Sequence, residues 1–221
     1  MAVLITDDVH LDIPVWVTSL ATFRRWTDEL DFPEKGNIWW LRGEVWADMS
    51  QEQIFSHIDV KGEIFFAIKS LLRENDTGRI FTDGLLLTNE AAGLSGNPDA
   101  TFFTHDARAE GRVVLIEGRI DGFTEVQGSP EMVLEVVSDG SIEKDLEILR
   151  EDYFTAGVQE YWLVDARSSP PKFDVLRRNS KGFVMTKKVA GWVKSSVLAR
   201  SFRLTEGKDR SGNPEYRLET K

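Results

Sequence analysis

The stretch from residue 132 to residue 165 constrains the fold more than any other part of the chain. It contains two apolar runs, 132–138 and 160–165, separated by a segment that Ser141 can cap as a helix and Gly157 can end. A near-continuous apolar run is typical of a strand in a sheet covered on both faces. The order strand, helix, strand predicts a βαβ unit, so we expect the two strands to be parallel.

Two acids lie in runs that read as strands. Glu135 lies within the run 132–138, and Asp99 follows Pro98 at the start of the run 99–104. A carboxylate in an apolar strand is costly to bury unless something pairs with it. On neighbouring strands the two could share a divalent ion, and Mg²⁺ prefers oxygen ligands and takes few of them from a protein. The pair is therefore a candidate metal site of a nuclease, with a backbone carbonyl beside Glu135 as a third ligand.

Such a site needs a positively charged side chain, and the expected position for it, two residues after Glu135, does not carry a lysine. Residue 137 points to the same side of the strand as Glu135, and there a valine cannot hold a water or a phosphate. Lys144, at the start of the following helix, is the leading candidate, and Arg150, two turns further on, is the second. A plainer reading stays open, in which Asp99 only caps its strand and Glu135 forms a buried salt bridge with Arg119, Lys144 or Arg150.

The rest of the chain predicts a mixed α/β or α+β fold. A capped helix begins at Ser19, a β-hairpin covers 38–49, and Ser50 can cap a long helix that reaches about Asn75 and ends by Gly78. Further expected strands are 79–82, 85–88 and 99–104, with short antiparallel strands between 173 and 204. The insert between residues 104 and 132 has a short apolar run at 113–116 and a segment, 122–128, that we expect to be a loop. We expect a mixed central sheet flanked by helices, with a C-terminal antiparallel strand extension.

The hairpin and the long helix supply two further candidates. Glu44, beside the hairpin turn, is a candidate third acid of the site. Ile54 and Ile58 open the apolar stripe of the long helix, and His57 lies on or beside that stripe. A lone histidine there is more often a hydrogen-bonded core residue than a ligand.

Composition narrows the class of protein. The 221 residues are 41% hydrophobic and 29% charged, which fits one globular domain. No run approaches the roughly 18 apolar residues of a membrane span and the N-terminus is unlike a signal peptide, so we expect a cytoplasmic protein with no membrane partner. The chain has no cysteine, which excludes disulfides and thiolate metal sites. The net charge of -10 argues against a generic charge-driven nucleic-acid binder, but it does not exclude a nuclease whose acids bind metal.

Several motifs together carry a family resemblance. They are 42–46 (Arg-Gly-Glu-Val-Trp), His57, Pro98-Asp99, 135–138 (Glu-Val-Val-Ser), Tyr153 and 156–165 (Ala-Gly-Val-Gln-Glu-Tyr-Trp-Leu-Val-Asp). The last block is the most specific, whereas Pro-Asp alone is weak. On these residues, from about 17 to 193, the chain resembles the Uma-type "putative restriction endonuclease" family of the PD-(D/E)XK nuclease superfamily.

The resemblance implies a restriction-endonuclease-like fold, Mg²⁺ dependence and DNA cleavage. It maps Asp99 and Glu135 onto the two metal-binding acids and Glu44 onto the acidic position before the long helix. Many members lack a lysine two residues after the glutamate and carry one four residues before the tyrosine. Here that position is Leu149, so the chain departs from both lysine patterns. This departure bears on catalysis more than on the fold.

We therefore expect a metal-dependent endonuclease that cleaves DNA with Mg²⁺, for which Mn²⁺ can substitute. The alternative is a catalytically impaired nuclease-fold protein that acts as a binding or interaction module. A homodimer would suit double-strand cutting, because each site cuts one strand. We expect an N-terminal extension over 1–16, a nuclease domain over 17–195 and a C-terminal tail over 196–221.

Overall fold

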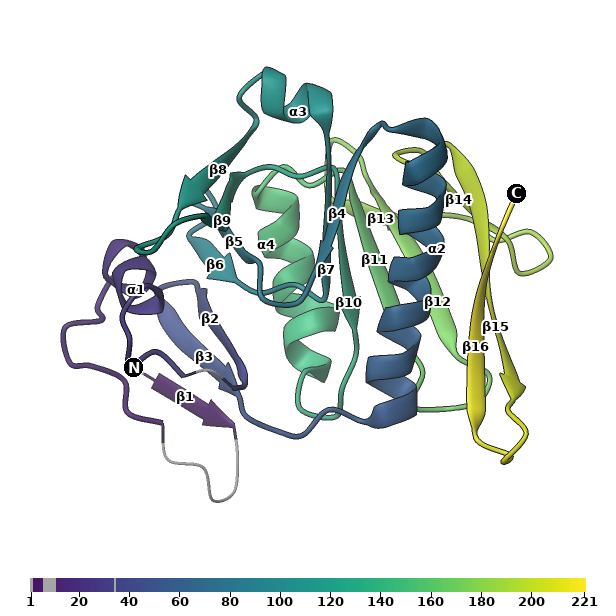
Figure 1. Cartoon of the computed structure of the whole chain (residues 1–221), viewed down its shortest axis with the longest axis horizontal. Helices are drawn as coiled ribbons and strands as arrows, with labels where there is room; N and C mark the ends of the chain where they lie inside the picture. Colours follow the sequence, from purple (N-terminus) through teal and green to yellow (C-terminus); the bar gives the residue numbers. More distant parts are fainter. Residues whose placement is uncertain (1, 6–10, 34) are drawn as a thin grey trace.

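The computed structural model describes residues 2–5, 11–33 and 35–221, and it contains three sheets (Figure 1). One is a seven-stranded sheet in the order β1-β3-β2-β6-β5-β9-β8. Its strands are β1 (Ala2–Ile5), β2 (Asn37–Leu41), β3 (Glu44–Asp48), β5 (Leu86–Asn89), β6 (Leu94–Gly96), β8 (Val113–Glu117) and β9 (Phe123–Gly128). Helix α1 (Leu20–Thr27), capped by Ser19 as expected, packs Phe23 and Trp26 against it.

The six-stranded sheet contains the predicted βαβ unit. Its order is β13-β12-β11-β10-β7-β4. The strands are β4 (Gly78–Thr82), β7 (Ala100–Thr104), β10 (Met132–Val136), β11 (Glu160–Asp165), β12 (Lys172–Arg178) and β13 (Phe183–Met185). Strands β10 and β11 are parallel and the other pairs are antiparallel, so the predicted parallel pair is confirmed.

Helices cover both faces of the six-stranded sheet, as the apolar run of β10 predicts. Helix α2 (Val60–Asn75) packs Ile64 and Ile68 on one face, against Leu134 of β10. The crossover is a π-helical segment, Lys144–Ile148, followed by α4 (Leu149–Thr155), which packs Leu149 on the other face. Figure 1 shows α2 in front of the sheet and α4 on its far side. The expected fold, a mixed sheet flanked by helices, is confirmed.

The C-terminal residues form a three-stranded antiparallel sheet beside α2. It consists of β14 (Val193–Ser195), β15 (Arg200–Lys208) and β16 (Pro214–Thr220). Phe202 packs edge-on against Trp162 of β11, with ring centroids 4.9 Å apart, and the Leu218 N–H donates to Glu63 of α2 at 2.8 Å. The expected C-terminal strand extension is therefore present and shares the core of the six-stranded sheet. The domain boundaries at 16/17 and 195/196 stay a prediction.

Three local predictions are wrong. Ser50 does not cap the long helix: it bonds to Asp48, and a π-helical segment, Ile54–Asp59, precedes α2. Because of that segment Ile54 and Ile58 are exposed, while His57 is buried. The segment 122–128 is mostly strand β9, paired with β5 and β8, rather than a loop. The predicted end of the long helix at about Asn75 is correct: Asp76, in the left-handed conformation, follows the last helical residue, and Gly78 already belongs to β4.

Two short connections lie next to these strands. The hairpin β2–β3 turns at Arg42-Gly43, as expected, and both residues have positive φ, which suits a tight two-residue turn. A short helix, α3 (His105–Ala109), follows β7. No helix within the described part of the chain is long and apolar enough to cross a membrane.

Candidate metal and nuclease site

The two predicted acids come together at one end of the six-stranded sheet. Leu134 of β10 pairs with Ala100 of β7, so the next residues in this antiparallel register are Glu135 and Asp99. Side chains at directly opposed positions lie on the same face of a sheet and within reach of each other. The Val136 N–H donates to Asp99 Oδ2 at 2.6 Å, which ties this carboxylate to β10. Both acids are buried.

Asp99 faces two basic side chains, one from the π-helical segment before α2 and one from the first turn of α2. Lys61 Nζ lies 3.3 Å from Asp99 Oδ1, and His57 Nε2 lies 3.7 Å from Oδ2. Burial raises the pKa of Asp99, and the charges of Lys61 and His57 offset this only in part. Burial alone would lower the pKa of Lys61. The negative charges of Asp99 and Asp83 outweigh this effect and raise the pKa above its usual value, so the ammonium stays charged.

Glu135 is held by a tyrosine and a lysine from the crossover. Tyr153 donates its hydroxyl to Glu135 Oε1 at 2.6 Å, and Lys144 Nζ lies 3.8 Å from Oε2. Burial raises the pKa of Glu135 well above its usual value; Lys144 opposes this, whereas Asp145 and Asp99 add to it. Lys144 also contacts Asp145 at 2.6 Å and lies over the Trp39 ring at 4.7 Å, which fixes its direction.

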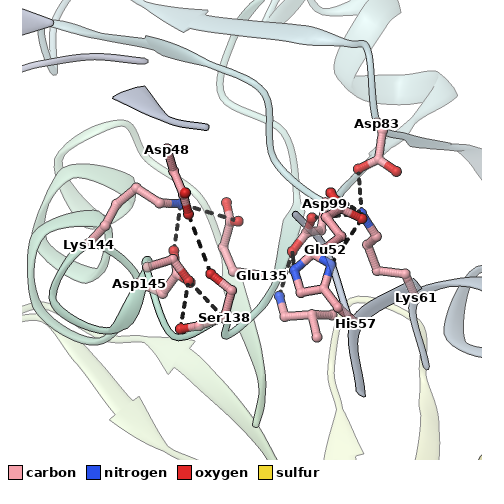
Figure 2. A network of polar contacts seen from close by, with 12 residues as sticks. Asp48, Glu52, His57, Lys61, Asp83, Asp99, Glu135, Ser138, Lys144 and Asp145 are labelled. Atoms are coloured by element: carbon pink, nitrogen blue, oxygen red, sulfur yellow. Dashed lines mark hydrogen bonds and ion pairs between the residues drawn. The ribbon is translucent and has the colours of Figure 1, made fainter. Parts of the chain in front are cut away.

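Figure 2 shows the resulting arrangement, in which the two acids lie between two clusters of charged residues. On one side are Asp48, Ser138, Lys144 and Asp145, and on the other are Glu52, His57, Lys61 and Asp83. A cavity of about 20 Å³ lies among them. Its lining consists of Asn37, Asp48, His57, Asn97, Asp99, Glu135, Val136, Ser138, Ser141, Lys144 and Asp145. That volume suits an ion or a water molecule, but not a nucleotide.

The donor set fits a magnesium ion. Asp99 and Glu135 supply hard carboxylate oxygens side by side, and Mg²⁺ commonly takes only one or two carboxylates from a protein and keeps several waters. Within residues 2–5, 11–33 and 35–221, no three histidine or acidic side chains already converge as a metal cage. Any ion here would therefore rely on two acids, backbone oxygens and water.

The other predicted site residues lie at different places. Lys144 lines the cavity, as the sequence predicts for the leading cation. Arg150 is exposed and donates to the Phe183 carbonyl at 2.9 Å, so it is not part of the cavity lining. Glu44 lies at the turn end of β3, four residues from Asp48, or about 13 Å along the strand. Asp48 is the hairpin acid that lines the cavity.

Three residues of this site were missed or undervalued at the level of sequence. Asp48 was not singled out, although in a strand it shares a face with Glu44. Lys61 was not singled out either; its signal is its position four residues after His57, inside the apolar face of the long helix. His57, expected as an ordinary core residue, is buried but contacts Asp99 and lies 3.2 Å from Glu52.

The larger hollow of the molecule is elsewhere. It is a groove of about 660 Å³ beside α1 and the β8–β9 hairpin. Its central charges are already neutralised, since Arg24 pairs with Glu90 and Glu125, and Arg119 pairs with Glu29. Volume alone is therefore a poor guide to a reactive site, and the candidate site is the smaller cavity at the buried acid pair.

Comparisons with known proteins agree with this fold. A solved structure described as "a putative nuclease belonging to DUF820 from Anabaena variabilis ATCC 29413" superimposes with a TM-score of 0.59 at 18% identity, covering 82% of this chain and 90% of that one. At this identity the likeness concerns the fold alone. No curated protein matches the chain. A family model described as "Putative restriction endonuclease" matches residues 20–205, and the chain therefore belongs to this family, Uma2.

Proposed function

We propose that this protein is a metal-dependent endonuclease that hydrolyses phosphodiester bonds in DNA, with Mg²⁺ held by Asp99 and Glu135. The observation that carries the proposal is the β7–β10 register, which sets two buried carboxylates side by side at a cavity the size of an ion. The family to which the chain belongs supports a nuclease. Mn²⁺, with the same preference for oxygen ligands, is expected to substitute.

The chain's own residues prepare this site for phosphate chemistry. A bound Mg²⁺ would polarise the phosphoryl group and favour ionisation of an attacking water. The Val136 N–H and the Tyr153 hydroxyl each hold one oxygen of an acid, so the carboxylates of Asp99 and Glu135 have a fixed direction. Lys144, anchored on Asp145, brings a positive charge to within 3.8 Å of Glu135, where it can stabilise charge that builds on the phosphate.

DNA is the proposed substrate, and the strongly negative chain must bind it locally. With a net charge of -10, attraction to the phosphate backbone cannot come from the whole molecule. It must come from the metal and from cations at the site. We propose a homodimer as the form that cuts both strands, since one site cleaves one strand.

One observation favours the alternative of a catalytically impaired binding protein on the same fold. Both positions at which the family carries its lysine are apolar here: they are Val137 and Leu149. Both side chains are buried in the core with Tyr153 and Tyr161. Lys144 is then the only predicted cation in the cavity lining of the described chain. If Lys144 cannot substitute for the family lysine, the protein would bind without cutting.

The test is nicking of supercoiled plasmid DNA by the purified protein with Mg²⁺, Mn²⁺ or EDTA. Asp99→Asn and Glu135→Gln keep the shape of each side chain and remove its charge, and we expect each to lower the rate by about 10²-fold or more. Glu131→Gln is the matched control, because this acid lies just before β10 and bonds to Thr104 and Arg112, away from the cavity.

The outcomes separate the two functions. Metal-dependent nicking that survives both Asp99→Asn and Glu135→Gln would show that the site is elsewhere. A folded wild-type protein that neither nicks DNA nor binds metal by calorimetry would favour the binding-module alternative. Equal losses in Glu131→Gln would mean that the substitutions act through folding rather than through the site.

A further inference from the structure

Lys61 is a buried lysine on the core side of helix α2. It is only 6% exposed and follows His57 by four residues, on the side of the helix that also carries Ile64 and Ile68. A lysine on a helix normally extends its amine into water. Here the side chain instead places its ammonium at the edge of the acid pair.

Three carboxylates surround the ammonium group. Lys61 Nζ lies 3.0 Å from Glu52, 3.0 Å from Asp83 and 3.3 Å from Asp99. Glu52 comes from the segment before α2 and Asp83 from the turn after β4. A cation surrounded by acidic oxygens from three parts of the chain is fixed in place, as an ion in a coordination site would be. Lys61 is therefore anchored independently of Asp99.

Lys144 makes a matching contact on the other acid. Its amine lies 3.8 Å from Glu135, on the crossover side of the cavity. Each acid of the pair thus has one ammonium group beside it, and the two ammonium groups come from different helical segments (Figure 2). Sites that act on phosphodiesters through two divalent ions hold those ions about 3.5–4 Å apart on shared carboxylates. A fixed ammonium group 3.3 Å from Asp99 occupies the surroundings that a second ion would need.

We propose that Lys61 is a positioning residue that serves as a built-in cation on Asp99 in place of a second divalent ion, so that Asp99 and Glu135 take a single ion. This inference rests on the proposed metal site. Like charges repel strongly in a buried site, where the effective dielectric constant is low. The ammonium of Lys61 therefore excludes a second ion from Asp99, while it keeps that carboxylate directed toward β10.

The test is the number of Mn²⁺ ions bound per chain, measured by isothermal titration calorimetry together with the electron paramagnetic resonance signal of free Mn²⁺. We expect one ion for the wild type. For Lys61→Met, which removes the charge and keeps most of the side-chain volume, we expect two. Lys61→Arg retains the charge and should bind one. Lys69→Met is the matched control on the same helix, since Lys69 lies over the Phe65 ring, and it should also bind one.

The result separates this inference from the proposed function. If the wild type shows no Mn²⁺ binding that is lost in Glu135→Gln, the proposed metal site itself is wrong. If the wild type binds one such ion and Lys61→Met also binds one, the metal site stands and the role of Lys61 is overturned. Lys61→Gln, which can still bond to Glu52 and Asp83, is the second neutral variant if thermal melting shows that Lys61→Met is unfolded. If the wild type binds two Mn²⁺ ions per chain and Glu135→Gln abolishes that binding, the proposed role of Lys61 is overturned without any variant at residue 61.

Discussion

Glu160 is a buried carboxylate that attaches the C-terminal sheet to the core, and its removal gives a sharp prediction. Its Oε1 accepts from the Ser196 N–H at 2.5 Å, the Ser196 hydroxyl at 2.6 Å and the Val197 N–H at 3.2 Å. Its Oε2 accepts from the Ser195 hydroxyl at 2.6 Å and the Trp162 indole at 3.1 Å. In the described part of the chain no lysine, arginine or histidine forms an ion pair with it, so five donors alone stabilise the charge.

The substitution Glu160→Gln keeps the shape and replaces one oxygen with a donor. At least one N–H, from the backbone or the indole, then loses its acceptor at a cost of about 1–3 kcal/mol, and the remaining bonds weaken because the acceptor is neutral. We expect a total loss of about 3 kcal/mol in the free energy of unfolding. Urea denaturation followed by tryptophan fluorescence should therefore show a midpoint lower by about 1 M.

The control is Glu206→Gln, because Glu206 is an acid on β15 whose bond to Ser169 is exposed. Its free energy of unfolding should stay within about 0.5 kcal/mol of that of the wild type. A Glu160→Gln midpoint equal to or above that of the wild type would refute the reasoning. It would mean that relief from burying a charge outweighs the five lost or weakened hydrogen bonds.

Further predictions concern the acid pair and its surroundings. Lys144→Met should lower the nicking rate by about 10²-fold. Arg150→Ala, which removes an exposed side chain, should change the rate by less than about threefold. Equal nicking rates for the two variants would contradict the role of Lys144. Because burial raises the pKa of Glu135, the native state binds a proton at this group more readily than the unfolded chain does. The metal-free wild type should therefore lose stability relative to Glu135→Gln as the pH rises from 4.5 through that raised value, and parallel urea midpoints would argue against it. Gly96→Ala would place a Cβ atom 2.0 Å from the Trp39 ring and should lower the unfolding free energy by about 1–3 kcal/mol; an unchanged urea midpoint would show that the ring can move aside.

The fold is predictable from sequence where local signals and burial agree. The runs 132–138 and 160–165 are apolar on both faces because helices cover both sides of their sheet, so the strands, the crossover and the parallel pairing all follow. Strand β9 has no such signal, since its residues are largely polar, a glycine precedes it and its last residue is Gly128. Its pairing with β5 and β8 is set by tertiary contacts between distant segments.

The start of the long helix shows a different limit. A repeat of 3.6 residues assigns Ile54 and Ile58 to the core, but the π-helical turns before α2 shift the register, so His57 is turned inward and the two isoleucines face solvent. Sequence periodicity cannot reveal that shift, because it assumes a uniform α-helical repeat, and the inward His57 has its partners, Glu52 and Asp99, outside that repeat.

The site is predictable in its acids and less so in its cations. Asp99 and Glu135 are conspicuous because a carboxylate is rare in an apolar strand. Lys61 is not conspicuous, because a lysine in a helix is usually solvated, and its burial follows only once Glu52 and Asp83 are known to surround it. Periodicity places Glu44 and Asp48 on one face, but the sequence does not say which end of the hairpin meets the cavity.

The most direct test of the central claim is a crystal of the wild-type protein grown with Mn²⁺, measured for anomalous scattering. We expect a peak in the cavity, within about 2.3 Å of carboxylate oxygens of both Asp99 and Glu135. The same experiment on Glu135→Gln should show no peak there. A strong peak elsewhere on the chain, with none between the two acids at saturating Mn²⁺, would show that Asp99 and Glu135 do not hold the metal ion.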